Sequence, residues 1–205
     1  MKLCNNEKMK QMKKDIILAG VGGQGILSIA ATIGTAAVNS NLFLKQAEVH
    51  GMSQRGGDVQ SHLRLSSKNI YSDLIPKSKA DIIISVEPME ALRYIPMLSP
   101  DGWVITNINS FDNITNYPDI EKVLDKIKSL PKHIAIDADN IAKEIGSPRS
   151  ANIVVLGAAT PFLDLDYSSL EGAIKSIFGN KEEKVIQANL DALRAGREFT
   201  KKKID

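Results

Sequence analysis

Four glycines within residues 20–25 form the first cluster whose residue types and spacing could do chemistry. The run Gly20-Val21-Gly22-Gly23-Gln24-Gly25 fits the pattern GxGxxG with one extra glycine, and an apolar stretch precedes it. This arrangement predicts a strand that ends in a tight turn, followed by a helix whose first N–H groups have no partner within the helix. Such groups attract anions. We therefore predict that Gly20, Gly22, Gly23, Gln24 and Gly25 bind the anionic part of a cofactor.

A second polar loop with functional side chains follows at residues 48–57. The guanidinium of Arg55 could bind a carboxylate or a phosphate, and Gly56 and Gly57 would let the backbone approach the anion. The imidazole of His50 could transfer protons near neutral pH. We predict that Glu48, Arg55, Gly56 and Gly57 clamp an anionic substrate group, and that His50 and Arg55 are the candidate catalytic residues. The structural alternatives are a solvated arginine in a turn and a loop histidine that caps backbone groups.

The glycine run alone leaves two other interpretations open. It could bind a nicotinamide or flavin dinucleotide, because Glu48 lies roughly 20 residues further on, where an acid can hold a ribose hydroxyl. However, Glu48 leads into a glycine-rich loop rather than a crossover helix, and the chain has little room for a separate substrate domain. The glycines could also serve only to let a strand and a helix pack closely.

Composition and charge exclude several classes of protein. The 26 basic and 24 acidic residues nearly balance, so nucleic acid is not expected as a partner. The only cysteine, Cys4, cannot form an internal disulfide or hold a cluster, and no metal site is predicted. No apolar run is long enough for a signal peptide or a membrane span, which favours a cytoplasmic protein without membrane contact. Residues 1–11 are expected to form a disordered extension, with Met1 and Met12 as alternative starts.

Alternating strand and helix patterns must position these loops. Strands are expected at residues 15–19, 42–49, 58–66, 80–86, 103–106 and 133–136, and helices from residue 26 and at 88–95, 120–127, 170–178 and 181–199. Residues 70–75 are expected to pair with 58–66 as a hairpin. By periodicity, residues 151–161 could be either strand or helix. The pattern predicts an α/β fold of Rossmann-like type, a three-layer sandwich around a largely parallel sheet with an antiparallel hairpin insertion. Glu87 would lie at the end of the 80–86 strand, at the edge of the parallel sheet where ligands bind. Alternatively, its carboxylate would only place a favourable negative charge at a helix N-terminus.

The helix after the glycine run has an unusual composition. No charged residue occurs from Gly20 to Leu44. A helix with one face in water normally carries charge on that face. We therefore expect a second layer or another subunit to cover this helix.

Taken together in this order, these motifs carry a family resemblance. They comprise residues 15–25, the pattern Glu48-xx-Gly51-xxx-Arg55-Gly56-Gly57, Ala80-Asp81 through Glu87-Pro88, residues 151–158 and the helix at 189–196. This combination resembles the gamma-type subunit of the 2-oxoacid:ferredoxin oxidoreductases. The run His50 to Gly57 is most similar to the beta subunit of the indolepyruvate branch. The resemblance implies that residues 12–200 form a single gamma-type catalytic domain of the pyruvate/ketoisovalerate oxidoreductase kind, and that residues 151–161 are helical.

The resemblance also implies an activity and partners. Such an enzyme oxidatively decarboxylates a 2-oxoacid, such as indolepyruvate or another aryl pyruvate, to the acyl-CoA and passes electrons to ferredoxin. The complex uses thiamine diphosphate, iron–sulfur clusters and coenzyme A. This chain lacks cysteine motifs and a thiamine signature, for which Gly57-Asp58-Val59 is the nearest approach. The cofactors are therefore expected on an alpha subunit, and the anion held by Arg55 would be a substrate carboxylate or a CoA phosphate. The alternatives are a compact NAD(P)-binding reductase and a non-catalytic nucleotide-binding or scaffold module.

Overall fold

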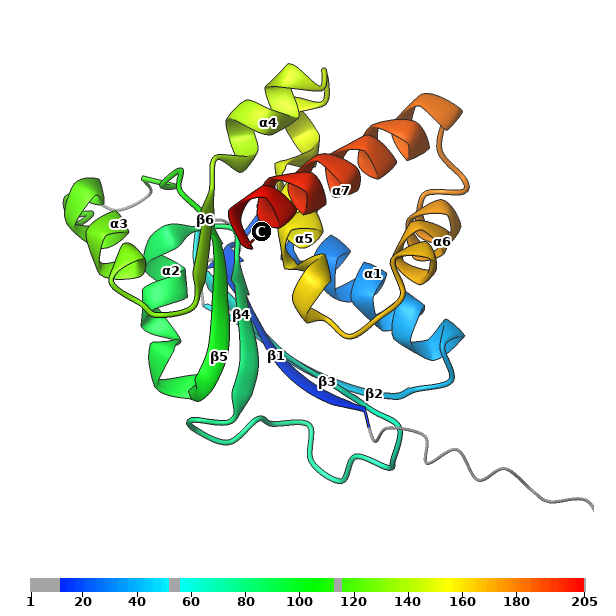
Figure 1. Ribbon diagram of the computed structural model, residues 1–205, viewed down its shortest axis with the longest axis horizontal. Coiled ribbons are helices and arrows are strands. Elements are labelled where there is room, and N and C mark those ends of the chain that lie inside the picture. Colours follow the sequence, from blue (N-terminus) through cyan, green and yellow to red (C-terminus); the bar gives the residue numbers. More distant parts are fainter. Residues whose placement is uncertain (1–11, 52–55, 113–115, 205) are drawn as a thin grey trace, which may run out of the picture.

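The sheet of this protein has six strands, and helices cover both of its faces (Figure 1). The computed structural model describes residues 12–51, 56–112 and 116–204, so the extension at 1–11 and Arg55 lie outside the described residues. In chain order the strands are β1 (Lys13–Val21), β2 (Phe43–His50), β3 (Asp58–Ser66), β4 (Ala80–Ser85), β5 (Leu98–Asn107) and β6 (His133–Ile136). Their order in the sheet is β2-β3-β1-β4-β5-β6.

The sheet is mixed, with a parallel part and an antiparallel edge. Neighbouring strands run parallel from β1 through β4 and β5 to β6, whereas β3 is antiparallel to both β1 and β2. This confirms the predicted α/β class and the largely parallel sheet. Strand β2 forms one edge of the sheet and β6 the other.

Most helices lie on one face of the sheet. The helices are α1 (Ile26–Asn39), α2 (Pro88–Arg93), α3 (Ile120–Lys128), α4 (Ala138–Glu144), α5 (Ala151–Ala159), α6 (Tyr167–Ile177) and α7 (Glu183–Ile204), with short 3-10 turns η1 (Ile95–Met97), η2 (Pro148–Ser150) and η3 (Thr160–Phe162). Helices α1, α5 and α7 pack on one face, with α6 against α1, and α2 and α3 lie on the other (Figure 1).

Two apolar cores result from the alternation of side chains along the central strands. Ile16 and Leu18 of β1 join the large core under α1, α5 and α7. Ile17 and Ala19 point to the opposite face and join the smaller core, which contains Tyr94. Since successive strand residues face opposite sides, a strand that is buried on both faces must be apolar throughout.

The antiparallel pair differs from the predicted hairpin. Strand β3 pairs with β2 along its length, from Phe43 opposite Ser66 to His50 opposite Val59, and with β1 on its other side. Both edges of β3 are therefore occupied, and residues 70–75 have no edge left to pair with. They form no strand, and Ile75 instead buries its side chain and donates its N–H to His62 Nδ1 at 3.0 Å. The predicted pairing with 70–75 was wrong.

The helices of the last third agree with the expectations in most places. Residues 151–159 form α5, as the family resemblance predicted, and almost all of its residues are buried. A helix that is buried all round has no polar face, so periodicity could not distinguish it from a strand. Helix α7 extends to Ile204, beyond the expected end at 199. Helix α4 was not predicted from the sequence.

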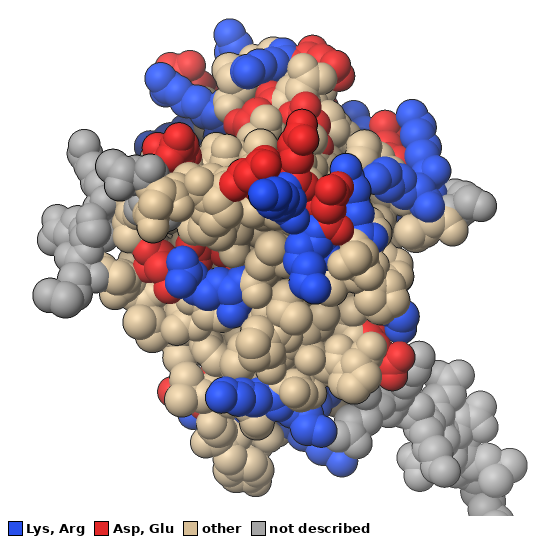
Figure 2. Space-filling model, turned by 90° about the vertical axis from the view of Figure 1, so that its left-hand side faces the viewer, with Lys and Arg blue, Asp and Glu red and all other residues tan. Residues whose placement is uncertain are grey.

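Helix α1 is covered only in part. Helix α6 packs along one side of it, and this confirms the expected second layer there. Leu27 is 55% exposed, Val38 is 56% exposed and Ala31 is also exposed, so an apolar stripe remains along the helix. On the face of the molecule shown in Figure 2, basic and acidic side chains are interspersed, and no continuous basic area is visible among the described residues.

Candidate functional site

The glycine run forms the turn between β1 and α1, as predicted. Gly25 is the N-cap of α1 in a left-handed conformation, with φ of +81°, and the first turn of α1 carries no acidic residue. A β-carbon on Gly25 would lie 2.5 Å from Nδ2 of Asn152, which donates to the Gly25 carbonyl at 3.1 Å. Gly25 is therefore required both by its backbone angles and by the close approach of α5.

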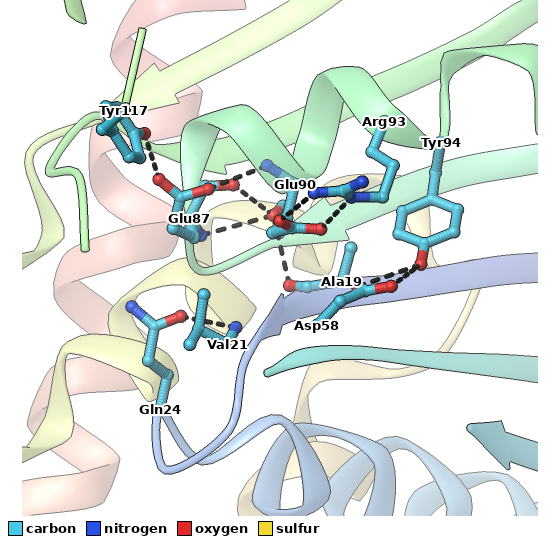
Figure 3. Close-up of polar contacts among 10 residues, drawn as sticks. Ala19, Val21, Gln24, Asp58, Glu87, Glu90, Arg93, Tyr94 and Tyr117 are labelled. Carbon is cyan, nitrogen blue, oxygen red and sulfur yellow. Dashed lines mark hydrogen bonds and ion pairs between the residues drawn. The ribbon is translucent and has the colours of Figure 1, made fainter. Parts of the chain in front are cut away.

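The other residues of the turn divide into structural and open positions. A β-carbon on Gly20 would lie 2.4 Å from a Val86 methyl, so Gly20 lets β1 and β4 pack closely. Gln24 Oε1 accepts the N–H of Val21 at 2.8 Å and closes the turn (Figure 3). Gly23, with φ of +100°, has no atom within 4 Å of its β-carbon position. Of the predicted cofactor-binding residues, Gly23 is thus the one with the most open surroundings.

The structure brings the second polar loop next to the first. The N–H of Gly22 donates to the carbonyl of Gly57 at 2.9 Å. Nε2 of the His50 ring contacts Oε1 of the Glu48 carboxylate. His50 also lines a cavity of about 350 Å³ together with Gly22, Gly23 and Gly25. Candidate residues from both loops therefore share one cavity, whereas Arg55 is outside the described residues.

The position of Glu48 argues against a dinucleotide site. In dinucleotide-binding folds the acid that holds the ribose ends the strand beside the glycine-bearing strand. Glu48 lies near the end of β2, and β3 separates β2 from β1. The carboxylate of Glu48 pairs with His50 instead. The geometry does not support the NAD(P) alternative in this form.

Glu87 belongs to a buried polar network on the other side of the sheet. Its side chain is fully buried and caps α2, since Oε2 accepts the N–H of Glu90 at 2.8 Å. The hydroxyl of Tyr117 donates to Oε1 (Figure 3). Burial raises the pKa of Tyr117, and the hydrogen bond to Glu87 raises it further. Tyr117 therefore keeps its proton and acts as a donor.

A second part of this network holds the start of β3. The hydroxyl of Tyr94 donates to both carboxylate oxygens of Asp58, at 3.0 and 2.8 Å, and Arg93 donates to both oxygens of Glu90, at 2.7 and 2.9 Å. Burial raises the pKa of Glu90 and nearby Asp58 raises it further, whereas the Arg93 hydrogen bonds lower it. Because Asp58 directly follows Gly57, the Tyr94 contact fixes one end of the second loop to the C-terminal end of α2.

Several residues of this network were not predicted as functional from the sequence. Glu90 and Tyr94 lie in the segment 88–95, where a helix was expected, and Tyr117 precedes α3, but no motif indicates that their side chains meet. The pattern Glu87-Pro88 at the end of a strand was the one available signal, because it predicts a capped helix start.

Two properties concern metal binding and membranes. Within residues 12–51, 56–112 and 116–204, no group of three or more His, Cys, Asp or Glu side chains could hold a metal ion. None of the helices in that part of the chain is long and apolar enough to span a bilayer.

Comparison with known proteins identifies the family. The model of the pyruvate ferredoxin/flavodoxin oxidoreductase family matches residues 15–199. The chain belongs to this family. It is 33% identical to indolepyruvate oxidoreductase subunit IorB of Archaeoglobus fulgidus, over 90% of this chain and 94% of that protein. It is 35% identical to IorB of Thermococcus kodakarensis, over 89% of this chain and 93% of that protein.

The fold of this family member matches solved structures. The crystal structure of the keto/oxoacid ferredoxin oxidoreductase gamma subunit from Geobacter sulfurreducens has a TM-score of 0.67 at 21% identity, covering 92% of this chain and 99% of that one. At this identity the likeness concerns the fold. The named relatives are subunits of 2-oxoacid oxidoreductases, as the sequence motifs predicted.

Proposed function

We propose that this chain is the beta-type subunit of an indolepyruvate:ferredoxin oxidoreductase. The enzyme would oxidatively decarboxylate an aryl 2-oxoacid to its acyl-CoA and pass the electrons to ferredoxin. The observation that carries this proposal is the similarity to IorB proteins along nearly their whole length. The cytoplasmic location stays a prediction.

The proposal assigns the redox groups to a partner alpha subunit. Iron–sulfur clusters are held by sets of cysteine thiolates, and this chain has one cysteine, which does not fit a cluster. When bound in the complex, thiamine diphosphate supplies the electron sink that decarboxylation needs. The chain from residue 12 to 200 would act as one gamma-type domain that completes the active site.

The two loops form this chain's part of the site in our proposal. Gly22, Gly23 and Gly25 border the cavity that His50 also lines, and Gly23 leaves room for a bound group. Glu48 positions the His50 ring through the contact between its carboxylate and Nε2. Arg55, with Gly56 and Gly57, would clamp the substrate carboxylate or a CoA phosphate.

Co-expression with a cluster-bearing alpha chain tests this function. We expect a stable complex that reduces ferredoxin or a viologen dye only when an aryl 2-oxoacid and CoA are present. Failure to form a complex, or activity with NAD(P) instead of the dye, would contradict the proposal.

Arg55→Ala tests the clamp within that complex. A charge-assisted hydrogen bond contributes about 1.5–3 kcal/mol, so kcat/KM should fall at least about tenfold. Arg194→Ala is the matched control, because Arg194 lies on α7, away from both loops, and its guanidinium pairs with Asp191 of the same helix at 3.4 Å. If Arg55→Ala and Arg194→Ala both have the kcat/KM of the wild type, the alternative of a non-catalytic scaffold module is favoured.

A further inference from the structure

The start of β3 joins the two loops of the proposed site. The carbonyl of Gly57 accepts the N–H of Gly22, from the glycine turn, at 2.9 Å. One residue further on, the carbonyl of Asp58 accepts the N–H of Gly51, which directly follows His50, at 2.7 Å. The position of the start of β3 therefore sets the separation between the glycine turn and His50.

Successive side chains at this point face opposite sides of the sheet. Val59 lies opposite His50 in the pairing of β2 with β3, and both line the cavity of about 350 Å³, which we call the His50 cavity. Asp58 points to the other side, where the Tyr94 hydroxyl donates to its carboxylate, at 2.8 Å from one oxygen and 3.0 Å from the other (Figure 3). Because Asp58 and Val59 are adjacent in one strand, a shift of Asp58 relative to Tyr94 also moves the wall of the His50 cavity.

Tyr94 is a firm attachment point for Asp58. It is the C-cap of α2, is only 8% exposed and belongs to the smaller core together with Ile17 and Val104. Burial raises the pKa of Tyr94, and the hydrogen bond to Asp58 raises it further, so the hydroxyl keeps its proton and donates. A hydrogen bond to a carboxylate is stronger than one between neutral groups. The ring fills the core, and the hydroxyl is the part of Tyr94 that acts on Asp58.

We propose that Tyr94 is a positioning residue of the reaction site: its hydroxyl fixes Asp58, and Asp58 fixes the separation of His50 from the glycine turn. Tyr94 belongs to the core on the opposite face of the sheet, so it acts through Asp58 and not by contact with a bound group. The geometric part of this inference concerns this chain alone, and its kinetic part rests on the proposed function.

Nuclear magnetic resonance of the histidine rings tests the geometric part on the full chain. The chain has three histidines, so the ring signals can be assigned individually. Tyr94→Phe removes only the hydroxyl, and we expect it to shift the ring signals of His50 and leave those of His133, on β6, unchanged. Asp58→Ala should produce the same shift. Asp58→Asn retains an acceptor for the Tyr94 hydroxyl and should keep the His50 signals near those of the wild type.

Tyr167→Phe is the matched control for loss of a tyrosine hydroxyl. The hydroxyl of Tyr167, on α6, is buried but has no hydrogen-bond partner among the described residues. Its removal should leave the His50 signals unchanged, and circular dichroism should show that all variants fold. Unchanged His50 signals in Tyr94→Phe, or an equal shift in Tyr167→Phe, would overturn the proposal.

Kinetics of the complex with the alpha chain test the kinetic part. Tyr94→Phe should lower kcat about tenfold, because a small displacement of a catalytic group slows the reaction. It should leave KM within about twofold, because Tyr94 does not touch the substrate. The double variant Tyr94→Phe/Asp58→Ala should be no slower than the slower single variant, since both changes break the same contact.

Failure of this inference differs from failure of the proposed function. An active complex with unchanged kcat for Tyr94→Phe, or additive losses in the double variant, overturns the role of Tyr94. A wild-type complex that does not oxidise 2-oxoacids contradicts the proposed function instead, and the ring signals then still decide whether Tyr94 positions His50.

Discussion

His62 shows how burial determines the charge state of one side chain. It lies on β3, is 7% exposed, and its Nδ1 accepts the N–H of Ile75 at 3.0 Å. Burial lowers the pKa of His62, and the charge of Arg64 lowers it further. The folded protein therefore contains a neutral ring, which keeps the long segment between β3 and β4 attached to the sheet.

This charge state predicts a pH dependence of stability. In the unfolded chain the His62 ring takes up a proton below its ordinary pKa of 6.5, whereas in the folded chain it does not. The unfolded state then binds more protons, so the free energy of unfolding falls as the pH drops below 6.5 towards the lower folded pKa. His62→Asn keeps an acceptor near Nδ1 but does not titrate.

Denaturant titrations at several pH values measure this effect. Between about pH 7.5 and about pH 5.5, the wild type should lose more stability than His62→Asn. If the free energy of unfolding changes with pH by the same amount in both proteins, His62 is protonated equally in the folded and unfolded states.

The glycine run illustrates what residue types alone can predict. Its turn and the helix start followed from the spacing of the glycines. Their separate roles did not, because Gly20 is constrained by Val86 and Gly25 by Asn152, residues distant in the sequence. A cavity of about 470 Å³ beside the turn was not predicted for the same reason, because its lining comes from residues 23–24, 86, 107–111, 139 and 149–152.

At the level of elements, the closest contact joins α5 and α7 through two glycines. A β-carbon on Gly157 would lie 2.2 Å from the carbonyl oxygen of Leu193, and one on Gly196 would lie 1.9 Å from that of Val154. Thr200 Oγ1 donates to the Ala158 carbonyl at 2.9 Å near the same contact. The two backbones therefore touch, and α5 is held in the core at a distance that larger residues would not allow.

Gly196→Ala should destabilise the protein by about 3 kcal/mol, because the helices must separate to admit the methyl group. Gly172→Ala is the matched control. Gly172 lies in α6, is exposed, and has no atom within 4 Å of its β-carbon position. There the substitution should stabilise by roughly 0.5–1 kcal/mol, since alanine favours the helix. Thermal unfolding of both variants measures the difference, and equal effects would contradict this packing argument.

Elements with clear periodicity were predictable, and those defined by long-range pairing were not. The apolar stretch of β4 and the amphipathic α3 follow from local pattern. The partner of β3 does not, because pairing depends on which edges remain free in the completed sheet. Helix α4 was missed because it is short and its apolar residues are few.

At the level of the whole molecule, the apolar stripe of α1 is the surface best suited to a partner subunit. Leu27 and Val38 lie on the same side of the helix, since eleven residues correspond to about three turns. Both are more than half exposed, and the helix carries no charge. The family's multi-subunit organisation supplies a reason for such a stripe.

Leu27→Glu combined with Val38→Glu should weaken assembly with the alpha chain at least about tenfold, because binding would then bury carboxylates. Stability of the isolated chain should change by less than about 1 kcal/mol, since both sites are exposed. Ile204→Glu, 47% exposed at the end of α7, is the control. Size-exclusion chromatography of mixed chains measures assembly, and unchanged assembly by the double variant would place the interface elsewhere.

Gly23 borders both the cavity lined by His50 and a second cavity of about 470 Å³ that Arg149 and Asp139 also line. It has no side chain, and no atom lies within 4 Å of the position that a β-carbon would occupy. Two ligands that bound in these cavities and each shifted the Gly23 backbone would be energetically coupled. By thermodynamic linkage the influence is mutual, so each occupant changes the affinity for the other by the same factor.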